Sequence, residues 1–161
     1  MNVITQTDVE ALTLTTRADL SASLERAWQL VSDPRKLERW WGPPEWRAKF
    51  LRFEFEPEGR AHYCMRGPDG EESHGWWRFV SITEPREVSI EDGFADGQGE
   101  PTGDLGVTTV HIAFEPIESG TRVTIVSGFE SAEQLDEMVK MGMDEGIRSA
   151  VGQMQQILDE S

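Results

Sequence analysis

The sequence predicts an α+β domain in which a curved antiparallel sheet of six to seven strands wraps around one long C-terminal helix, with two short helices after the first strand. Two observations predict this class. Between residues 46 and 129, short segments with alternating apolar residues follow one another, separated by turns rich in glycine and proline. Such neighbours usually pair, which gives an antiparallel meander. A long helical pattern follows them, and it alone is long enough to cover one face of the sheet.

The first third of the chain predicts one strand and two helices. Residues 12–20 alternate between apolar and polar side chains, as in a half-buried strand, whereas residues 1–10 show no such pattern and are expected to be a flexible lead. Ser23 is suited to cap a helix that begins just after it. Asp33 should end that helix, because the residue before a proline is disfavoured in the α region. A second short helix is expected over residues 35–41.

The middle of the chain predicts the strands of the sheet. In residues 46–56 the alternation changes phase at Phe50-Leu51, which predicts a bulge that bends the sheet. Strands over residues 60–66 and 73–82 flank a Gly-Pro-Asp-Gly turn and should form a hairpin.

The remaining strands lie around a glycine-rich segment. A strand is expected around residue 90, followed by a long mobile loop over residues 93–106. A last hairpin should consist of residues 107–115 and 121–129. Because no repeat or linker interrupts the chain, residues 11–161 are expected to form a single domain.

The C-terminal helical pattern carries the strongest indication of a cavity. Ser131 is suited to cap its start, and a kink or break is expected near Gly142, where the apolar face changes direction. After that point Gly146 and Ala150 lie in the centre of the apolar face. Small residues there indicate either a strand backbone in close contact or a hollow that a large side chain would otherwise fill. The pattern leaves both alternatives open.

The tryptophans add to this indication. Six of them in 161 residues can line a ligand cavity, and each indole N–H offers a directional contact, although they can equally build an ordinary core. The candidates for lining a cavity are Trp28, Trp40, Trp41, Trp46, Phe50, Trp77, Phe79, Met143, Gly146, Ile147, Ala150 and Met154.

Composition excludes several classes of partner. A formal net charge of −15 disfavours phosphate backbones and anionic lipid, so neither nucleic acid nor a membrane is expected as a partner. The single cysteine cannot form an intrachain disulfide. The first ten residues lack the pattern of a signal peptide, and a cytoplasmic location is expected.

No catalytic residue, metal site or cofactor is predicted. His62 and Cys64 share one strand face, and His74 lies on the partner strand of the hairpin, so a suitable register could bring them together around Zn²⁺ or Cu. The sequence fixes neither the register nor a fourth ligand. His111 and the acidic pair Glu91-Asp92 are interpreted as solvated.

One segment supports a more specific assignment. The run from Ala22 to Pro43 combines a helix, an Asp-Pro break and a Trp-Trp-Gly-Pro ending. It resembles the activator of Hsp90 ATPase homologue 1-like (AHSA1-like) family, within the START-like, Bet v 1-type (SRPBCC) superfamily. The resemblance covers about residues 11–159 and implies a helix-grip fold with an internal apolar pocket. Members of the family usually carry an aromatic residue where this chain has Met143, a departure that could widen the pocket.

Three functions follow as hypotheses. The first is a carrier or sensor that binds an unidentified small apolar or aromatic ligand in the internal cavity. The second is a protein-interaction domain with a chaperone partner, similar to an Hsp90 co-chaperone. The third is a cyclase- or hydrolase-type enzyme that uses the same pocket. The chain is expected to be a monomer or a weak homodimer.

Overall fold

The computed structural model describes residues 2–160 and places eight strands in one antiparallel sheet with the order β1-β2-β8-β7-β6-β5-β4-β3. The strands are β1 (Val3–Asp8), β2 (Thr13–Leu20), β3 (Arg47–Phe53), β4 (Arg60–Arg66), β5 (Glu72–Thr83), β6 (Glu87–Ala95), β7 (Val107–Ile117) and β8 (Gly120–Gly128). The helices are α1 (Leu24–Ser32), α2 (Pro34–Leu37), α3 (Ala132–Lys140), α4 (Met143–Val151) and α5 (Met154–Asp159). This arrangement confirms the α+β class, with more strands than the sequence predicts.

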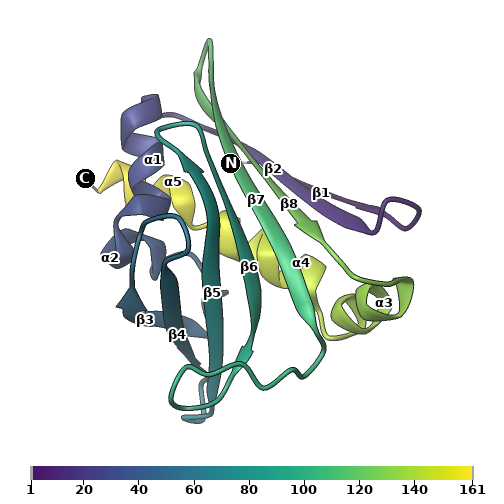
Figure 1. The fold of residues 1–161 in the computed structure, drawn as a ribbon. Coiled ribbons are helices and arrows are strands. Elements are labelled where there is room, and N and C mark those ends of the chain that lie inside the picture. The colour runs from purple at the N-terminus through teal and green to yellow at the C-terminus, as the bar shows by residue number, and fades with distance from the viewer. Residues whose placement is uncertain (1, 161) are drawn as a thin grey trace.

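The helices cover one face of the sheet. In Figure 1, α4 and α5 run behind the strands, α1 and α2 lie beside α5, and α3 lies at the other end of this layer. We call the covered face of the sheet the inner face and the opposite one the outer face. The main core lies between the inner face and the helices, and its largest fully buried side chains include Trp40, Trp77 and Phe79. Within residues 2–160, no helix combines the length and the apolar character needed to cross a membrane.

The N-terminal segment differs from its prediction. Instead of a flexible lead over residues 1–10, the chain forms β1, which pairs with β2 from Val3 opposite Ala18 to Asp8 opposite Thr13. Most of β1 is exposed, so main-chain hydrogen bonds rather than burial hold this edge strand, and its side chains show no apolar alternation. Residues 1 and 161, the ends of the predicted lead and of the predicted domain, lie outside the described residues.

The first helix begins and ends as predicted. The Ser23 hydroxyl accepts a hydrogen bond from the backbone N–H of Arg26, and Asp33 leaves the helical conformation. Asp33 also caps α2, because its carboxylate accepts from the backbone N–H of Arg35. α2 is shorter than the helix predicted over residues 35–41, because the N–H groups of Arg39 and Trp40 bond to carbonyls three residues back, in tighter turns.

The bend predicted in the first strand of the meander is present. The β3–β4 register shifts between Phe50 and Arg52, at the expected change of phase. The predicted glycine-rich loop is shorter than expected, because β6 continues to Ala95 and a bridge between Ala95 and Pro101 ties the loop to the end of that strand.

The C-terminal helix is divided into three segments. Gly142 has φ +87° and separates α3 from α4, which confirms the break predicted there. A second interruption around Gly152 and Gln153 separates α4 from α5. At that point the Gln153 amide donates to the carbonyl of Gly42 in the Trp-Trp-Gly-Pro segment at 2.8 Å, which fixes the helical layer to residues far away in the sequence.

Candidate functional site

Two adjoining hollows lie between the inner face and the helical layer. The larger hollow has a volume of about 380 Å³ and extends from Trp46 and Phe94 to Met138 and Met141. The smaller one has about 230 Å³ and lies under α4. The two hollows share five of their lining residues, so we treat them as parts of one cavity. The shared residues are Pro43, Tyr63, Met65, Asp92 and Met143.

The small residues of α4 account for the smaller hollow. Gly146, Ile147 and Ala150 line it from the helix side. A Cβ atom added at Gly146 would meet no heavy atom within 4 Å, so no strand backbone approaches this glycine closely. The sequence left open whether the small residues allow close contact with a strand backbone or leave a hollow, and the geometry at Gly146 fits the hollow.

The twelve candidates from the sequence fall into two groups. Seven of them line the cavity. Trp46 lines the larger hollow, and the other six line the smaller one; these six are Trp40, Trp41, Met143, Gly146, Ile147 and Ala150. Five line neither hollow and are at most 3% exposed in the core; they are Trp28, Phe50, Trp77, Phe79 and Met154. Edge-to-face aromatic contacts fill the space around this second group, for example between Trp28 and Phe114 and between Phe50 and Trp77.

A polar pair that the sequence analysis misses lies where the two hollows meet. Tyr63 on β4 donates a hydrogen bond from its hydroxyl to Asp92 Oδ1 on β6, over 2.8 Å. The ring crosses β5 at Gly75, which faces Tyr63 in the strand register and has no side chain to obstruct it. Glycine at this position therefore lets a tyrosine reach a carboxyl group two strands away.

Burial shifts the pKa values of both groups. It raises the pKa of Asp92 from 3.8 to about 7, although hydrogen bonds from Tyr63, the Trp77 indole and the Gly93 backbone act in the opposite direction. Burial, together with the neighbouring Asp92 charge, also raises the pKa of Tyr63 well above its ordinary value. The carboxyl group of Asp92 can therefore change its protonation state near neutral pH, inside a mainly apolar cavity.

The pattern of β6 contains a signal for this residue. Val88, Ile90, Asp92 and Phe94 share one phase of the strand, so Asp92 continues the row of side chains that faces inward. The sequence interpretation treats Asp92 together with Glu91 as a solvated pair, which is wrong for Asp92. Only Glu91 points outward, where it pairs with Arg78 at 2.7 Å.

Further polar atoms border the smaller hollow without a partner. Among the described residues, the Trp41 indole N–H and the Ser127 hydroxyl are buried and lack a partner of hydrogen-bond geometry, although the Trp41 N–H lies close enough to Tyr63 to lower the pKa of its hydroxyl. The Trp77 indole N–H also lacks a partner of hydrogen-bond geometry, although it lies close enough to Asp92 to lower the pKa of that carboxyl group. Leaving a buried polar group without a hydrogen bond costs free energy, so these donors favour an acceptor atom of water or a ligand nearby.

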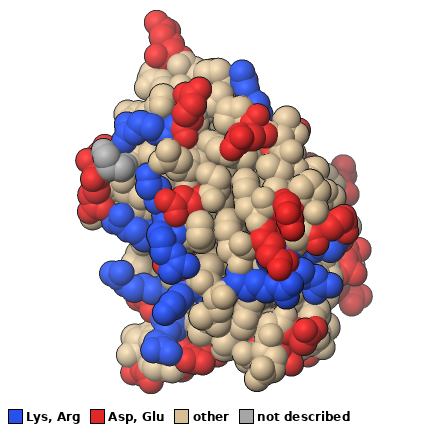
Figure 2. Space-filling view, turned by 60° about the vertical axis from the view of Figure 1, so that its left-hand side comes forward, with Lys and Arg blue, Asp and Glu red and all other residues tan. Residues whose placement is uncertain are grey.

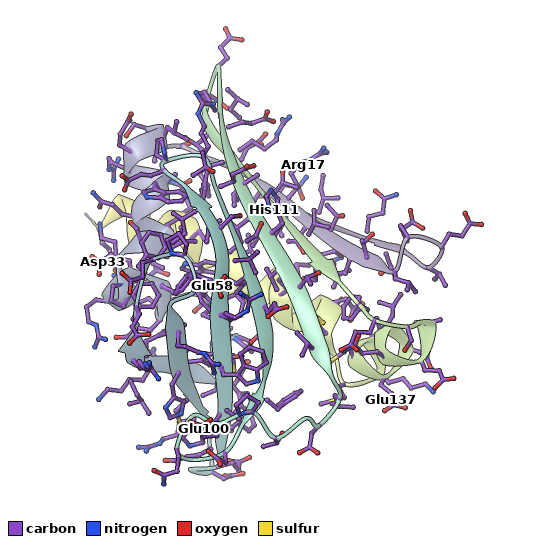
Figure 3. All side chains as sticks on the ribbon, in the orientation of Figure 1. Arg17, Asp33, Glu58, Glu100, His111 and Glu137 are labelled. Carbon is purple, nitrogen blue, oxygen red and sulfur yellow. The ribbon has the colours of Figure 1, made fainter. Side chains whose placement is uncertain are left out.

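The histidines lie at strand positions of the outer face, although His74 also borders the larger hollow. The β4–β5 register pairs Cys64 with His74, and the His62 and His74 rings are in contact through Nε2 and Nδ1 at 2.8 Å. His111 also lies on the outer face (Figure 3), where its ring contacts Ser89 and Glu87 and its side chain is 42% exposed. Burial raises the pKa of the Cys64 thiol, which disfavours a nucleophilic role.

The charge on the surface is not uniform. Figure 2 brings the side of the molecule with α2 and β3 forward and shows Lys and Arg side chains gathered next to one another, despite the formal net charge of −15. Arg47, Lys49 and Arg66 border a further hollow on this side.

Comparison with known proteins identifies the family. The model of the family described as "Activator of Hsp90 ATPase homolog 1-like protein" matches residues 21–159. A protein from Arthrobacter aurescens with a solution NMR structure is 47% identical, with 98% of this chain and 92% of that chain covered and a TM-score of 0.93. A protein from Mycobacterium smegmatis is 40% identical, with coverage of 98% and 97% and a TM-score of 0.89.

More distant similarity extends to the fold alone. The AHSA1 protein from Silicibacter pomeroyi is 19% identical over 92% of this chain and 98% of that chain, with a TM-score of 0.74. No curated protein matches the chain at a significant level. Because the family match spans nearly the whole sequence and the architecture agrees with it, the chain belongs to the activator of Hsp90 ATPase homologue 1-like family, within the Bet v 1-like superfamily.

Proposed function

We propose that the chain is a carrier or sensor that binds one small, mainly apolar or aromatic molecule in the cavity under α4. The observation that carries this proposal is the open space at Gly146, where a side chain would fit and none is present. The larger hollow, at about 380 Å³, falls within the range of small-molecule sites. A ligand of this kind would gain affinity mainly from burial of apolar surface, at about 25 cal/mol per Å² before the costs of association.

The polar atoms narrow the class of ligand. Trp41 and Ser127 offer unpaired donors to the smaller hollow, and Asp92 and Tyr63 form a polar spot between the two hollows. A matching ligand has an apolar body and one oxygen or nitrogen atom that accepts hydrogen bonds. Met138, Met141 and Met143 border the larger hollow, and their flexible side chains can adjust to ligands of different shape.

The variant Gly146→Leu tests this proposal. Leucine should fill the smaller hollow without unfolding the domain, because the space is open and leucine is a better helix former than glycine. We expect at least tenfold weaker binding of the neutral fluorescent probe N-phenylnaphthylamine, measured by titration. The matched control is Gly146→Ala, which adds a single methyl group and should retain most of the binding. Unchanged affinity in Gly146→Leu, with the fold intact by circular dichroism, would rule out this cavity as the binding site.

One observation favours the enzymatic alternative over the chaperone-related one. A carboxyl group whose pKa lies near 7 in an apolar cavity is suited to general acid or base catalysis, and Asp92 has this property. His62 and His74 are less suited to this role, because their rings contact each other and His62 borders neither hollow, although His74 borders the larger one. If the chain is an enzyme, Asp92→Asn should abolish turnover and retain ligand binding. The chaperone-related role stays a prediction.

A further inference from the structure

A second cluster of chemically active side chains lies on the outer face of β4 and β5, and one of its members, His74, also borders the larger hollow. In β4 and β5, Cys64 faces His74 directly, and Glu72 lies two residues before His74 on the same side of the strand. One ligand atom from each residue lies within 4.8 Å of the other two. The three side chains border a hollow of about 380 Å³ that gives a hydrated ion access to them.

The separation of two of these atoms fits tetrahedral coordination. Glu72 Oε1 and His74 Nε2 are 3.4 Å apart. Oxygen and nitrogen ligands at about 2.0–2.2 Å from a tetrahedral Zn²⁺ lie about 3.4 Å from each other. Cys64 Sγ lies no more than 4.8 Å from one carboxylate oxygen of Glu72 and from one ring nitrogen of His74. In a tetrahedron with Zn–S at about 2.3 Å, the sulfur lies about 3.6 Å from the oxygen and nitrogen ligands, so Cys64 Sγ needs to approach them by up to about 1.3 Å.

The remaining atoms of the same side chains are held by neighbours. His74 Nδ1 is in contact with His62 Nε2 at 2.8 Å, which leaves His74 Nε2 on the side of Glu72. Glu72 Oε2 accepts a hydrogen bond from Arg66 Nη2 at 2.6 Å, which leaves Oε1 directed at His74. Partners of this kind fix the orientation of metal ligands and are common around zinc sites.

The charges also balance. A thiolate from Cys64 and the Glu72 carboxylate together neutralise the charge of a divalent cation. The occupied site therefore has no net positive charge that would repel the nearby Lys49 and Arg66. Thiolate, imidazole and carboxylate are together a ligand set that zinc accepts, whereas calcium and magnesium prefer oxygen ligands alone. Binding replaces the proton on Cys64 Sγ by a metal–sulfur bond and releases that proton to solvent.

We propose that Cys64 Sγ, Glu72 Oε1 and His74 Nε2 bind one zinc ion, with a water molecule as the fourth ligand. The sequence pattern suggests His62 as a ligand beside Cys64 and His74, but the contact between the rings makes His62 the partner that orients His74. Glu72 takes the third position in its place. Cys64 and Glu72 border neither hollow of the cavity, although His74 borders the larger one, and the zinc proposal does not depend on the proposed ligand.

Cobalt titration tests the site directly, because Co²⁺ occupies zinc sites and its thiolate complexes absorb light. We expect one Co²⁺ per chain, with a sulfur-to-cobalt charge-transfer band that Zn²⁺ abolishes on displacement. Cys64→Ser should lose this band, and His74→Gln should weaken metal binding at least tenfold. His111→Gln is the matched control, because it removes a histidine that also has a carboxylate neighbour but lies outside the cluster.

The orienting role of His62 has its own readout. His62→Phe should weaken zinc binding about 10- to 100-fold, and His62→Gln, whose side-chain oxygen can accept from His74, should restore most of it. Protection of Cys64 from alkylation by Zn²⁺ provides a measurement in wild-type protein that needs no variant. The proposal is wrong if wild-type protein shows no such band and no protection, or if the band persists in Cys64→Ser.

Discussion

Replacing Asp92 with asparagine is expected to raise the free energy of unfolding at pH 8 by several kcal/mol, and by clearly less at pH 5. Burial raises the pKa of Asp92 from 3.8 to about 7 in the folded protein. Between these two values the folded state keeps a proton that the unfolded state has lost, so stability falls as the pH rises. Above pH 7 both states are ionised, and the loss of stability is complete.

The size of this effect follows from the pKa difference. At about 1.4 kcal/mol per pKa unit, the interval between pH 5 and pH 7 corresponds to about 3 kcal/mol. Asp92 is only partly buried, so water in the cavity solvates the carboxylate and reduces this figure towards about 2 kcal/mol. Asparagine has no such ionisation and still offers an oxygen to the Tyr63 hydroxyl. The variant should therefore lose most of this pH dependence.

Urea unfolding at pH 5 and pH 8 measures the difference. The matched control is Glu91→Gln, which removes the neighbouring carboxylate from the outer face, where it pairs with Arg78. In the control, the stability should still fall between the two pH values as it does in wild type. An equal change in the free energy of unfolding for Asp92→Asn at both pH values would show that Asp92 is not buried as an acid in the cavity.

Local chemistry made several features predictable from the sequence. Ser23 and Asp33 carry the side-chain oxygens that cap helices, and they lie at helix boundaries in the structure. The change of phase at Phe50 and the glycine at position 142 require only a few neighbouring residues to be recognised. Each of these signals lies within one turn or one strand, so it can be recognised in the sequence without knowledge of the tertiary structure.

Features that depend on pairing across the sheet were not predictable. β1 is held by main-chain hydrogen bonds to β2, and its exposed side chains leave no apolar pattern. The pair of Tyr63 and Asp92 exists because β4, β5 and β6 are in a register that places Gly75 between them. The same dependence on register applies to Cys64 and His74. A sequence alone identifies the residue types, but the sheet decides which of them meet.

The cavity and the outer-face cluster therefore share the β4–β5 hairpin. Tyr63 and Met65 point to the cavity, whereas His62 and Cys64 alternate with them and point to the outer face. A shift of this hairpin by one residue would exchange the two sets of side chains. The position of Gly75 under the Tyr63 ring is one contact that fixes the register, and it can be tested.

Gly75→Ala is expected to destabilise the protein by about 1–3 kcal/mol or more, as overpacking of a rigid core does. A Cβ atom at position 75 would lie 2.1 Å from Tyr63 Cζ and 2.3 Å from its hydroxyl oxygen, far inside any normal contact. Trp41, Phe50 and Trp77 contact the ring, so it can retreat only towards the cavity that it borders. Displacing Tyr63 would also break its hydrogen bond to Asp92.

A double-mutant cycle separates this collision from a general effect of removing glycine from a strand. In a Tyr63→Ala background the ring is absent, so Gly75→Ala should cost much less there than in wild type, with a coupling energy of about 1 kcal/mol or more. Gly146→Ala is the control for an added methyl group in open space, and it should stabilise the protein by up to about 1 kcal/mol because alanine favours helix. An equal cost of Gly75→Ala in both backgrounds would mean that the tyrosine ring does not lie over this glycine. In that case Tyr63 could not reach Asp92 across β5, and the polar spot between the two hollows would have to be built differently.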